Sequence, residues 1–210
     1  MVMKPLRKLL VLPLAFLCTG CWQVVVVKKG IELYMELKEE IHYEYEGEIL
    51  RAVIRCDGFS HICHCTYYHD NGLVHMDGPV MADTWHGRVM VYDTTGEKLA
   101  SIVYELDQRH GTSMWFHTNG KVEVECKYER DKLHGGYVVY DEEGNTLSRT
   151  YYKHDLLHGA HYEFENWRVV FEAWYENDSL LYFTRFDQDG EIVENQGPEN
   201  WRQILETQEW

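Results

Sequence analysis

Residues 110–135 read HGTSMWFHTNGKVEVECKYERDKLHG, and the His-Gly pair that opens this stretch closes it 24 residues later. Three further columns keep the same phase: an aromatic residue six positions after each His and, after the first three His residues, a Gly ten positions later and a Tyr eighteen positions later. The His-Gly pairs are His86-Gly87, His110-Gly111, His134-Gly135 and His158-Gly159, and the later glycines are Gly96, Gly120 and Gly144. A fixed period of this kind predicts an array of similar supersecondary units.

Each unit has the composition of a β-hairpin. Residues 88–92 and 97–104 are rich in Val, Ile and aromatic residues, and residues 93–96 between them end in a Gly that supplies the positive φ of a tight turn. Residues 107–109 and their equivalents predict return loops. Even-numbered positions in both runs, from Met90 to Tyr104, hold most of the bulk, so we expect them to share one packed face opposite a mixed face.

The predicted fold is all-β, an elongated single antiparallel sheet of about six successive hairpins. We divide the chain into a signal peptide at 1–20, N-terminal strands and a cap at 21–61, the repeats at 62–192, and a C-terminal helix and tail at 193–210. Pro198, followed by an acidic residue and apolar residues at helical spacing, predicts a short helix over 198–206 that caps the last sheet edge.

The repeat resembles a known family. Asn119-Gly120-Lys121-Val122, followed by Lys132-Leu133-His134-Gly135, is similar to the MORN-repeat variant of bacterial exported 24-amino-acid repeat proteins and to the related YwqK-like antitoxin family. The resemblance covers 62–192. It implies an elongated sheet of hairpins that serves as a binding or scaffolding surface, with no shared catalytic residues.

The first residues predict export. Lys4, Arg7 and Lys8 precede an apolar run at 9–17 that is too short to span a bilayer, which is typical of a secretory signal. The ending resembles the lipobox of bacterial lipoproteins, which implies lipidation of Cys21 and attachment to the cell envelope through that lipid. An ordinary cleaved signal, giving a secreted protein, and an uncleaved anchor are the alternatives.

Composition excludes several classes of protein. With 4 Pro and 14% aromatic residues, the chain is neither Pro-rich nor wholly disordered. Its 20 Lys and Arg against 35 Asp and Glu give a net charge of −15, which repels phosphate backbones and argues against a nucleic-acid partner.

A Cys/His-rich segment precedes the repeats. It contains Cys56, His61, Cys63, Cys65 and His69. In an exported protein a disulfide from Cys56 to Cys63 or Cys65 is favoured, while free thiols and a metal site are the alternatives. Cys126 occupies a packed column and is expected to fill core space.

The His column invites a metal hypothesis that spacing argues against. Two strands separate equivalent positions, which places neighbouring His residues about 10 Å apart, too far to share one ion. We therefore expect no metal in this column, and we expect each His to hydrogen-bond a loop carbonyl while the following Gly permits the turn. A pH-sensitive ladder of His residues is the alternative.

The predicted function is recognition without bond chemistry. The chain shows no nucleophile motif and no phosphate-binding Gly loop, so we expect no enzyme, no cofactor and no small-molecule substrate. Candidates for a binding surface are Trp85, Trp115, Tyr137 and Tyr151, because Tyr and Trp offer large contact areas at low entropic cost. We expect a scaffold that binds a protein or glycan partner at the cell envelope. The alternatives are antitoxin-type neutralisation and metal binding by residues 56–69.

Overall fold

The computed structural model describes residues 39–57 and 61–197, where every regular element is a β-strand. The strands are β1 Glu39–Glu46, β2 Ile49–Asp57, β3 Ile62–Tyr68, β4 Val74–Met81, β5 Thr84–Trp85, β6 Gly87–Tyr92, β7 Lys98–Glu105, β8 Gln108–Arg109, β9 Gly111–Phe116, β10 Val122–Glu129, β11 Lys132–Tyr140, β12 Thr146–Lys153, β13 Leu156–Glu165, β14 Arg168–Glu176, β15 Ser179–Phe186 and β16 Ile192–Gln196. The predicted helix at 198–206, the signal peptide and Cys21 lie outside these residues.

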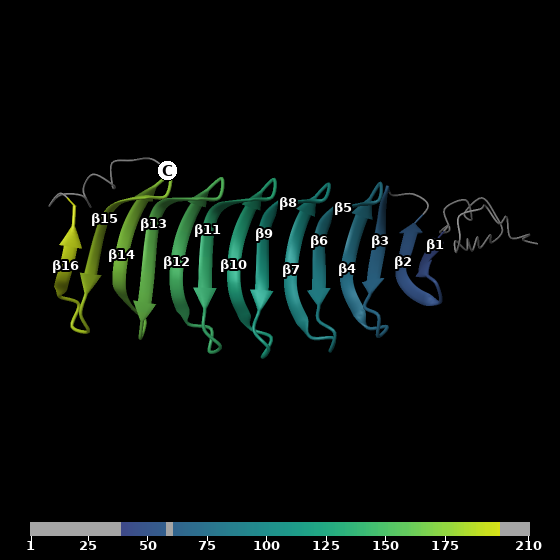
Figure 1. The fold of residues 1–210 in the computed structure, drawn as a ribbon, viewed down its shortest axis with the longest axis horizontal. Coiled ribbons are helices and arrows are strands. Elements are labelled where there is room, and N and C mark those ends of the chain that lie inside the picture. Colours follow the sequence, from purple (N-terminus) through teal and green to yellow (C-terminus); the bar gives the residue numbers. More distant parts are fainter. Residues whose placement is uncertain (1–38, 58–60, 198–210) are drawn as a thin grey trace, which may run out of the picture.

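All sixteen strands belong to one antiparallel sheet. Fourteen of them follow one another in chain order from β1 to β16, while the short β5 and β8 pair only with β4 and β7. Figure 1 shows the result as a long row of hairpins laid side by side. The prediction of an elongated single antiparallel sheet is confirmed. The described strands make seven hairpins, one more than expected, because β1 and β2 form a hairpin in the segment assigned to the cap.

The turns at the tips follow the predicted glycine chemistry. In the hairpin of β6 and β7, the Asp93 amide donates to the Glu97 carbonyl at 2.9 Å and the Gly96 amide donates to the Asp93 carbonyl at 3.1 Å. Gly96, Gly120 and Gly144 have φ of 90°, 81° and 91°, a backbone conformation that L side chains rarely adopt. These glycines close the turns as the sequence predicted.

The return connections are tighter than predicted. Leu106 and Asp107 both have positive φ, 51° and 65°, which is the geometry of a two-residue hairpin turn. Gln108 and Arg109, which the sequence placed in a loop, instead form β8 against the end of β7. The expectation of a three-residue loop was wrong because Leu106 and Asp107 close the turn between them, and Asp tolerates the left-handed region.

Register also corrects the predicted packed face. Met90 lies opposite Ser101, and Val89 lies opposite Ile102. Paired residues share a face and neighbours along a strand alternate, so an even-numbered residue of β6 faces the same side as an odd-numbered residue of β7. Even positions therefore lie on different faces in the two strands.

Buried side chains are few and spread along the sheet. The fully covered residues of the middle units are small, among them Val89, Ser113 and Cys126. The one larger cluster lies near the N-terminal end and consists of Ala52, Cys65 and Val80 with Ile54, Cys63 and Trp85 packed against them. Each hairpin thus depends mainly on its neighbours, as in other repeat folds. The described residues contain no helix long and apolar enough to cross a membrane.

Candidate binding face

One face of the sheet, here called face A, has a central row without a formally charged residue. The row takes one residue from each main strand between β2 and β15, and none of the twelve is Asp, Glu, Lys or Arg. Its members are Ile54, Cys65, Gly78, Val89, Ile102, Ser113, Cys126, Tyr137, Thr150, His161, Ala173 and Phe183. Depletion of charge at the centre of a surface is typical of protein interfaces.

The opposite side, face B, differs in this respect. Its central row is displaced by one residue along each strand and includes four charged side chains: Asp77, Glu125, Arg149 and Glu172. Both faces belong to the same single-layer sheet, and no described element packs over either of them. The charge pattern therefore distinguishes face A from face B.

Aromatic rings flank the charge-free row and contact one another across strands. The ring centroids of Trp115 and Tyr128 lie 6.4 Å apart, and those of Tyr137 and Tyr152 lie 5.7 Å apart. Tyr67 and Trp85 form a similar pair at 5.8 Å near the disulfide end. In all three pairs the rings are tilted or edge-on to each other instead of stacked flat.

The structure places the predicted surface residues on both faces. Trp85, Trp115 and Tyr137 share face A. Tyr151 lies opposite Gly136 and next to Thr150, which pairs with Tyr137, so it belongs to face B. The expected common surface was wrong for Tyr151, because the register across β11 and β12 pairs Tyr137 with Thr150, so the next residue along β12 faces the other side.

The polar groups of face A are mostly neutral or held by partners. The Arg109 guanidinium lies 4.1 Å from the centroid of the Tyr128 ring. Burial raises the pKa of the Tyr128 phenol to about 12, and burial likewise raises the pKa of Tyr137 and Tyr152. These phenols stay protonated at neutral pH and present a hydrogen-bond donor beside an apolar ring.

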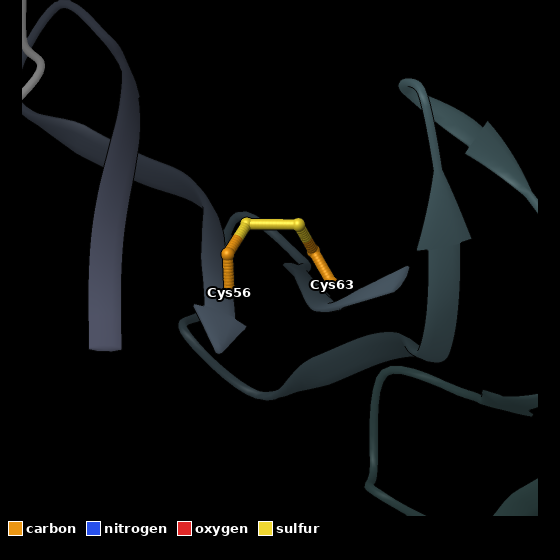
Figure 2. The surroundings of a disulfide bond; sticks show 2 residues. All are labelled: Cys56 and Cys63. Carbon is orange, nitrogen blue, oxygen red and sulfur yellow. A yellow bond between two sulfur atoms is a disulfide. The ribbon is translucent and has the colours of Figure 1, made fainter. Parts of the chain in front are cut away.

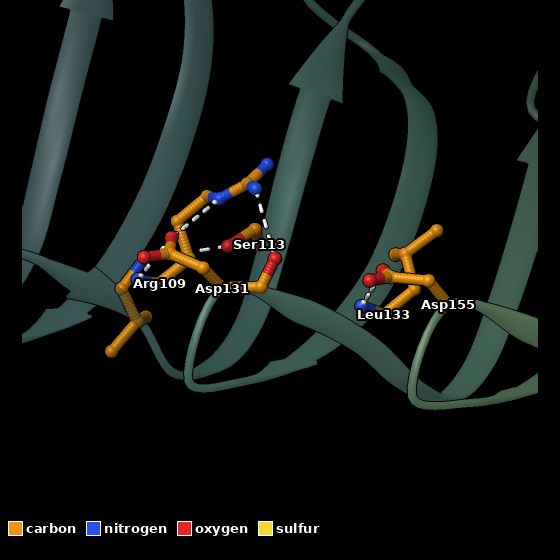
Figure 3. Close-up of polar contacts among 6 residues, drawn as sticks. Arg109, Ser113, Asp131, Leu133 and Asp155 are labelled. Atoms are coloured by element: carbon orange, nitrogen blue, oxygen red, sulfur yellow. Dashed lines mark hydrogen bonds and ion pairs between the residues drawn. The ribbon is translucent and has the colours of Figure 1, made fainter.

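A ladder of Asp residues holds the return turns to one another. The Asp131 carboxylate accepts hydrogen bonds from the Arg109 amide and from Arg109 Nε, both at 3.0 Å, and the Asp131 amide donates back to the Arg109 carbonyl at 2.9 Å. Asp155 accepts from the Leu133 amide at 2.7 Å in the next unit, as Figure 3 shows. Asp107 and Asp178 repeat the arrangement with Trp85 and Leu157. The sequence contained this column, but nothing local distinguished it from solvated turn residues.

The opposite edge has its own ladder, made by side chains of the tip turns. His69 Nε2 donates to the Tyr92 carbonyl at 3.0 Å, and His117 Nε2 donates to the Tyr140 carbonyl at the same distance. Asn71 and Asn119 make parallel bonds to carbonyls of the next turn. His residues do cap neighbouring turns, but not in the column that the sequence indicated.

The predicted His column behaves differently from expectation. Gly87, Gly111, Gly135 and Gly159 have φ between 93° and 116°, so the glycines permit the backbone as predicted. The Nδ1 atoms of the four preceding His residues are buried without a hydrogen bond, so these atoms do not make the expected bond from each His to a loop carbonyl. The backbone amides of His86 and His110 instead donate to the carbonyls of Pro79 and Val103. What these His-Gly positions share is thus the positive φ of the Gly and, at His86 and His110, a backbone hydrogen bond.

The Cys/His segment forms a disulfide. Cys56 and Cys63 lie opposite each other on β2 and β3 and are joined, as Figure 2 shows. The disulfide uses two of the thiols that a metal would need, and burial raises the pKa of the Cys65 thiol to about 12. Of the two His residues of the segment, His69 donates to the next turn and His61 is exposed. The favoured disulfide is confirmed between Cys56 and Cys63. Cys126 is a buried free thiol, as predicted.

Comparisons with known proteins add little. No protein-family model matches the chain, and no curated protein matches it. Among solved structures the chain is similar to a protein of unknown function from Bacteroides fragilis, with 8% identity over 79% of this chain and 95% of that chain and a TM-score of 0.15. That likeness is too distant to support an argument, so the resemblance to MORN-repeat variants stays a prediction.

Proposed function

We propose that the chain is a non-enzymatic scaffold that binds a protein partner along face A. The observation that carries the proposal is the charge-free central row flanked by Trp and Tyr on a single-layer sheet. Aromatic residues around an uncharged centre are the usual composition of interface hot spots. The repeats extend the same surface over successive hairpins, which suits a long partner segment.

A protein partner is favoured over a glycan by the way the rings lie. Sugars stack on flat, exposed aromatic faces, whereas Trp115 and Tyr137 are half-buried and contact neighbouring rings at interplanar angles of 58° and 66°. Arg109 covers the ring of Tyr128 as well. Such a surface offers contact area and a few donors, which a polypeptide can match.

We propose further that the protein is exported and held at the cell envelope by a lipid on Cys21. The disulfide between Cys56 and Cys63 supports this address, because disulfides persist in oxidising compartments. Mass spectrometry of the mature N-terminus is the test. Wild type should begin at an acylated Cys21, and Cys21→Ser should leave the membrane fraction. An unmodified mature N-terminus at another residue contradicts lipidation.

Site-specific photo-crosslinking in the source cells tests the binding face. A photoreactive phenylalanine analogue replaces Tyr137 or Trp115 on face A, and Tyr151 on face B is the matched control, since it is also a half-exposed aromatic on the same sheet. We expect one protein adduct from both face A positions and none from position 151. Equal adducts from both faces, a glycan adduct, or no adduct at positions 115 and 137 would contradict the proposal.

A further inference from the structure

Three side chains that the sequence analysis did not group meet at one return turn. Glu129 ends β10, His134 lies in β11, and His154 is the first residue of the turn between β12 and β13. One ligand atom of each lies within 4.8 Å of the other two. We propose that these residues form a binding site for a divalent transition-metal ion, with Zn²⁺ as its natural class.

The distances suit a tetrahedral ion. Two atoms bound to one zinc at about 2.1 Å and tetrahedral angles lie roughly 3.4 Å apart. Glu129 Oε2 and His134 Nδ1 are already 3.4 Å apart. The His134 and His154 ring centroids are 4.7 Å apart, so a rotation of exposed side chains brings the third atom into range. No strand has to move.

The Nδ1 atom of His134 is available as a ligand. His134 Nδ1 is buried and makes no hydrogen bond, although Glu129 lies beside it. The Nδ1 atoms of His86, His110 and His158 lack a hydrogen bond as well, so Glu129 and His154 distinguish this site, and the state of Nδ1 does not. Two imidazole nitrogens with one carboxylate favour Zn²⁺ and its neighbours over Mg²⁺ or Ca²⁺, which prefer all-oxygen ligands.

Equivalent positions in the other units lack the full set. His110 has Glu105 at 3.5 Å, but Arg130 occupies the turn position that His154 holds one unit later. His86 follows Met81 by five residues, and His158 follows Lys153 by the same interval. Among the four described units of the His column, the three ligands coincide only at His134. His154 comes from outside the His column, so the distance between members of that column does not limit this site.

Binding would join two neighbouring hairpins at the return edge. Glu129 and His134 belong to β10 and β11, while His154 belongs to the following turn. An ion that binds only the folded state raises stability in proportion to the logarithm of its concentration. The site is independent of face A, so it holds or fails separately from the proposed scaffold function.

Competition titration of Zn²⁺ against a chromophoric chelator tests the site, using the chain as isolated from cells and without a polyhistidine tag. We expect one Zn²⁺ per wild-type chain and a rise in Tm with Zn²⁺. His154→Asn keeps a residue that tolerates positive φ but removes the ligand, and should weaken binding roughly 100-fold. His110→Asn, beside Glu105 alone, is the matched control and should bind as wild type does.

A gain-of-site variant sharpens the test. Arg130→His places an imidazole at the position that completes the set with Glu105 and His110, and should raise the stoichiometry to two Zn²⁺ per chain. The proposal is overturned if wild type binds no Zn²⁺ at micromolar concentration, or if His154→Asn binds like wild type. It is likewise overturned if His110→Asn weakens binding as much as His154→Asn does, or if Arg130→His adds no second ion.

Discussion

The Asp131→Gly substitution tests whether the return-turn ladder holds neighbouring hairpins together. Asp131 has φ of 67°, a conformation that Gly adopts without strain, so the substitution removes the carboxylate while leaving the turn intact. The Asp131 amide keeps its bond to the Arg109 carbonyl. What is lost is the acceptor of the Arg109 amide and of Arg109 Nε.

The structure sets the size of the effect. A hydrogen bond from an amide to a carboxylate contributes about 1.5 kcal/mol at the low end of its range, which suits a partly exposed acceptor. The ion pair with Arg109 adds about 0.5 kcal/mol, because the two side chains are 35% and 49% exposed. Asp131→Gly should therefore lower the free energy of unfolding by roughly 2 kcal/mol.

Asp155→Gly is the matched control for the guanidinium. Asp155 holds the same turn position at φ of 72° and accepts the Leu133 amide at 2.7 Å, without an Arg partner. Asp155→Gly should lower the free energy of unfolding by about 1.5 kcal/mol, and the difference between the two variants isolates the contribution of the Arg109 guanidinium. The effect of the added glycine on the unfolded chain is common to both variants and cancels in that difference.

Urea unfolding followed by Trp fluorescence and far-UV circular dichroism measures these free energies, provided that the two signals give one transition. Exchange of the Arg109 and Leu133 amide protons gives a local readout, each amide losing protection in its own variant. A change within about 0.5 kcal/mol for Asp131→Gly, the range of ordinary surface substitutions, refutes the ladder. If Asp155→Gly lowers the free energy of unfolding more than Asp131→Gly does, the role assigned to Arg109 is refuted.

Three further outcomes follow from the same structure. The hydrogen bond from the Arg109 backbone amide lowers the pKa of Asp131. The stability advantage of wild type over Asp131→Gly should therefore be full above the unfolded pKa of about 3.9 and vanish as pH falls through the lower folded value, as urea midpoints would show. Cys56 and Cys63 are seven residues apart, so reduction of their disulfide should lower the free energy of unfolding by about 2.5 kcal/mol. The Tm is measured with and without reductant, with the Cys56→Ser, Cys63→Ser double variant as the reference. A wild-type Tm that reductant leaves unchanged would contradict this. Gly135 has φ of 104°, so Gly135→Ala should lower the free energy of unfolding by about 1 to 2 kcal/mol. Gly136 has no positive φ and open space where a Cβ would lie, so Gly136→Ala should be neutral or stabilising by about 0.5 kcal/mol. Equal urea midpoints for the two variants would be the contrary result.

The period of 24 predicted the hairpins because it is a local signal. Gly96, with a hydrophobic run on either side, specifies a tight turn and two strands without reference to the rest of the chain. The same local signal did not predict correctly which residues lie on which face of the sheet. Whether Tyr151 shares a side with Tyr137 depends on the register across β11 and β12, which pairs Tyr137 with Thr150, and the repeat columns do not give this pairing between strands.

The candidate sites are harder to read from sequence, since they are formed where different columns meet between units. Asp131 acts on Arg109, which lies 22 residues earlier, and Glu129 meets His154 across a hairpin. Within a unit each of these residues resembles an ordinary exposed turn or strand-end residue. The backbone repeats faithfully, so each return turn brings together the same three positions, and the sequence changes their chemistry from unit to unit: Glu105, His110 and Arg130 in one, Glu129, His134 and His154 in the next. A regular scaffold of this kind acquires a local site by substitution at one position, and for that reason Arg130→His is expected to create a second site without altering the fold.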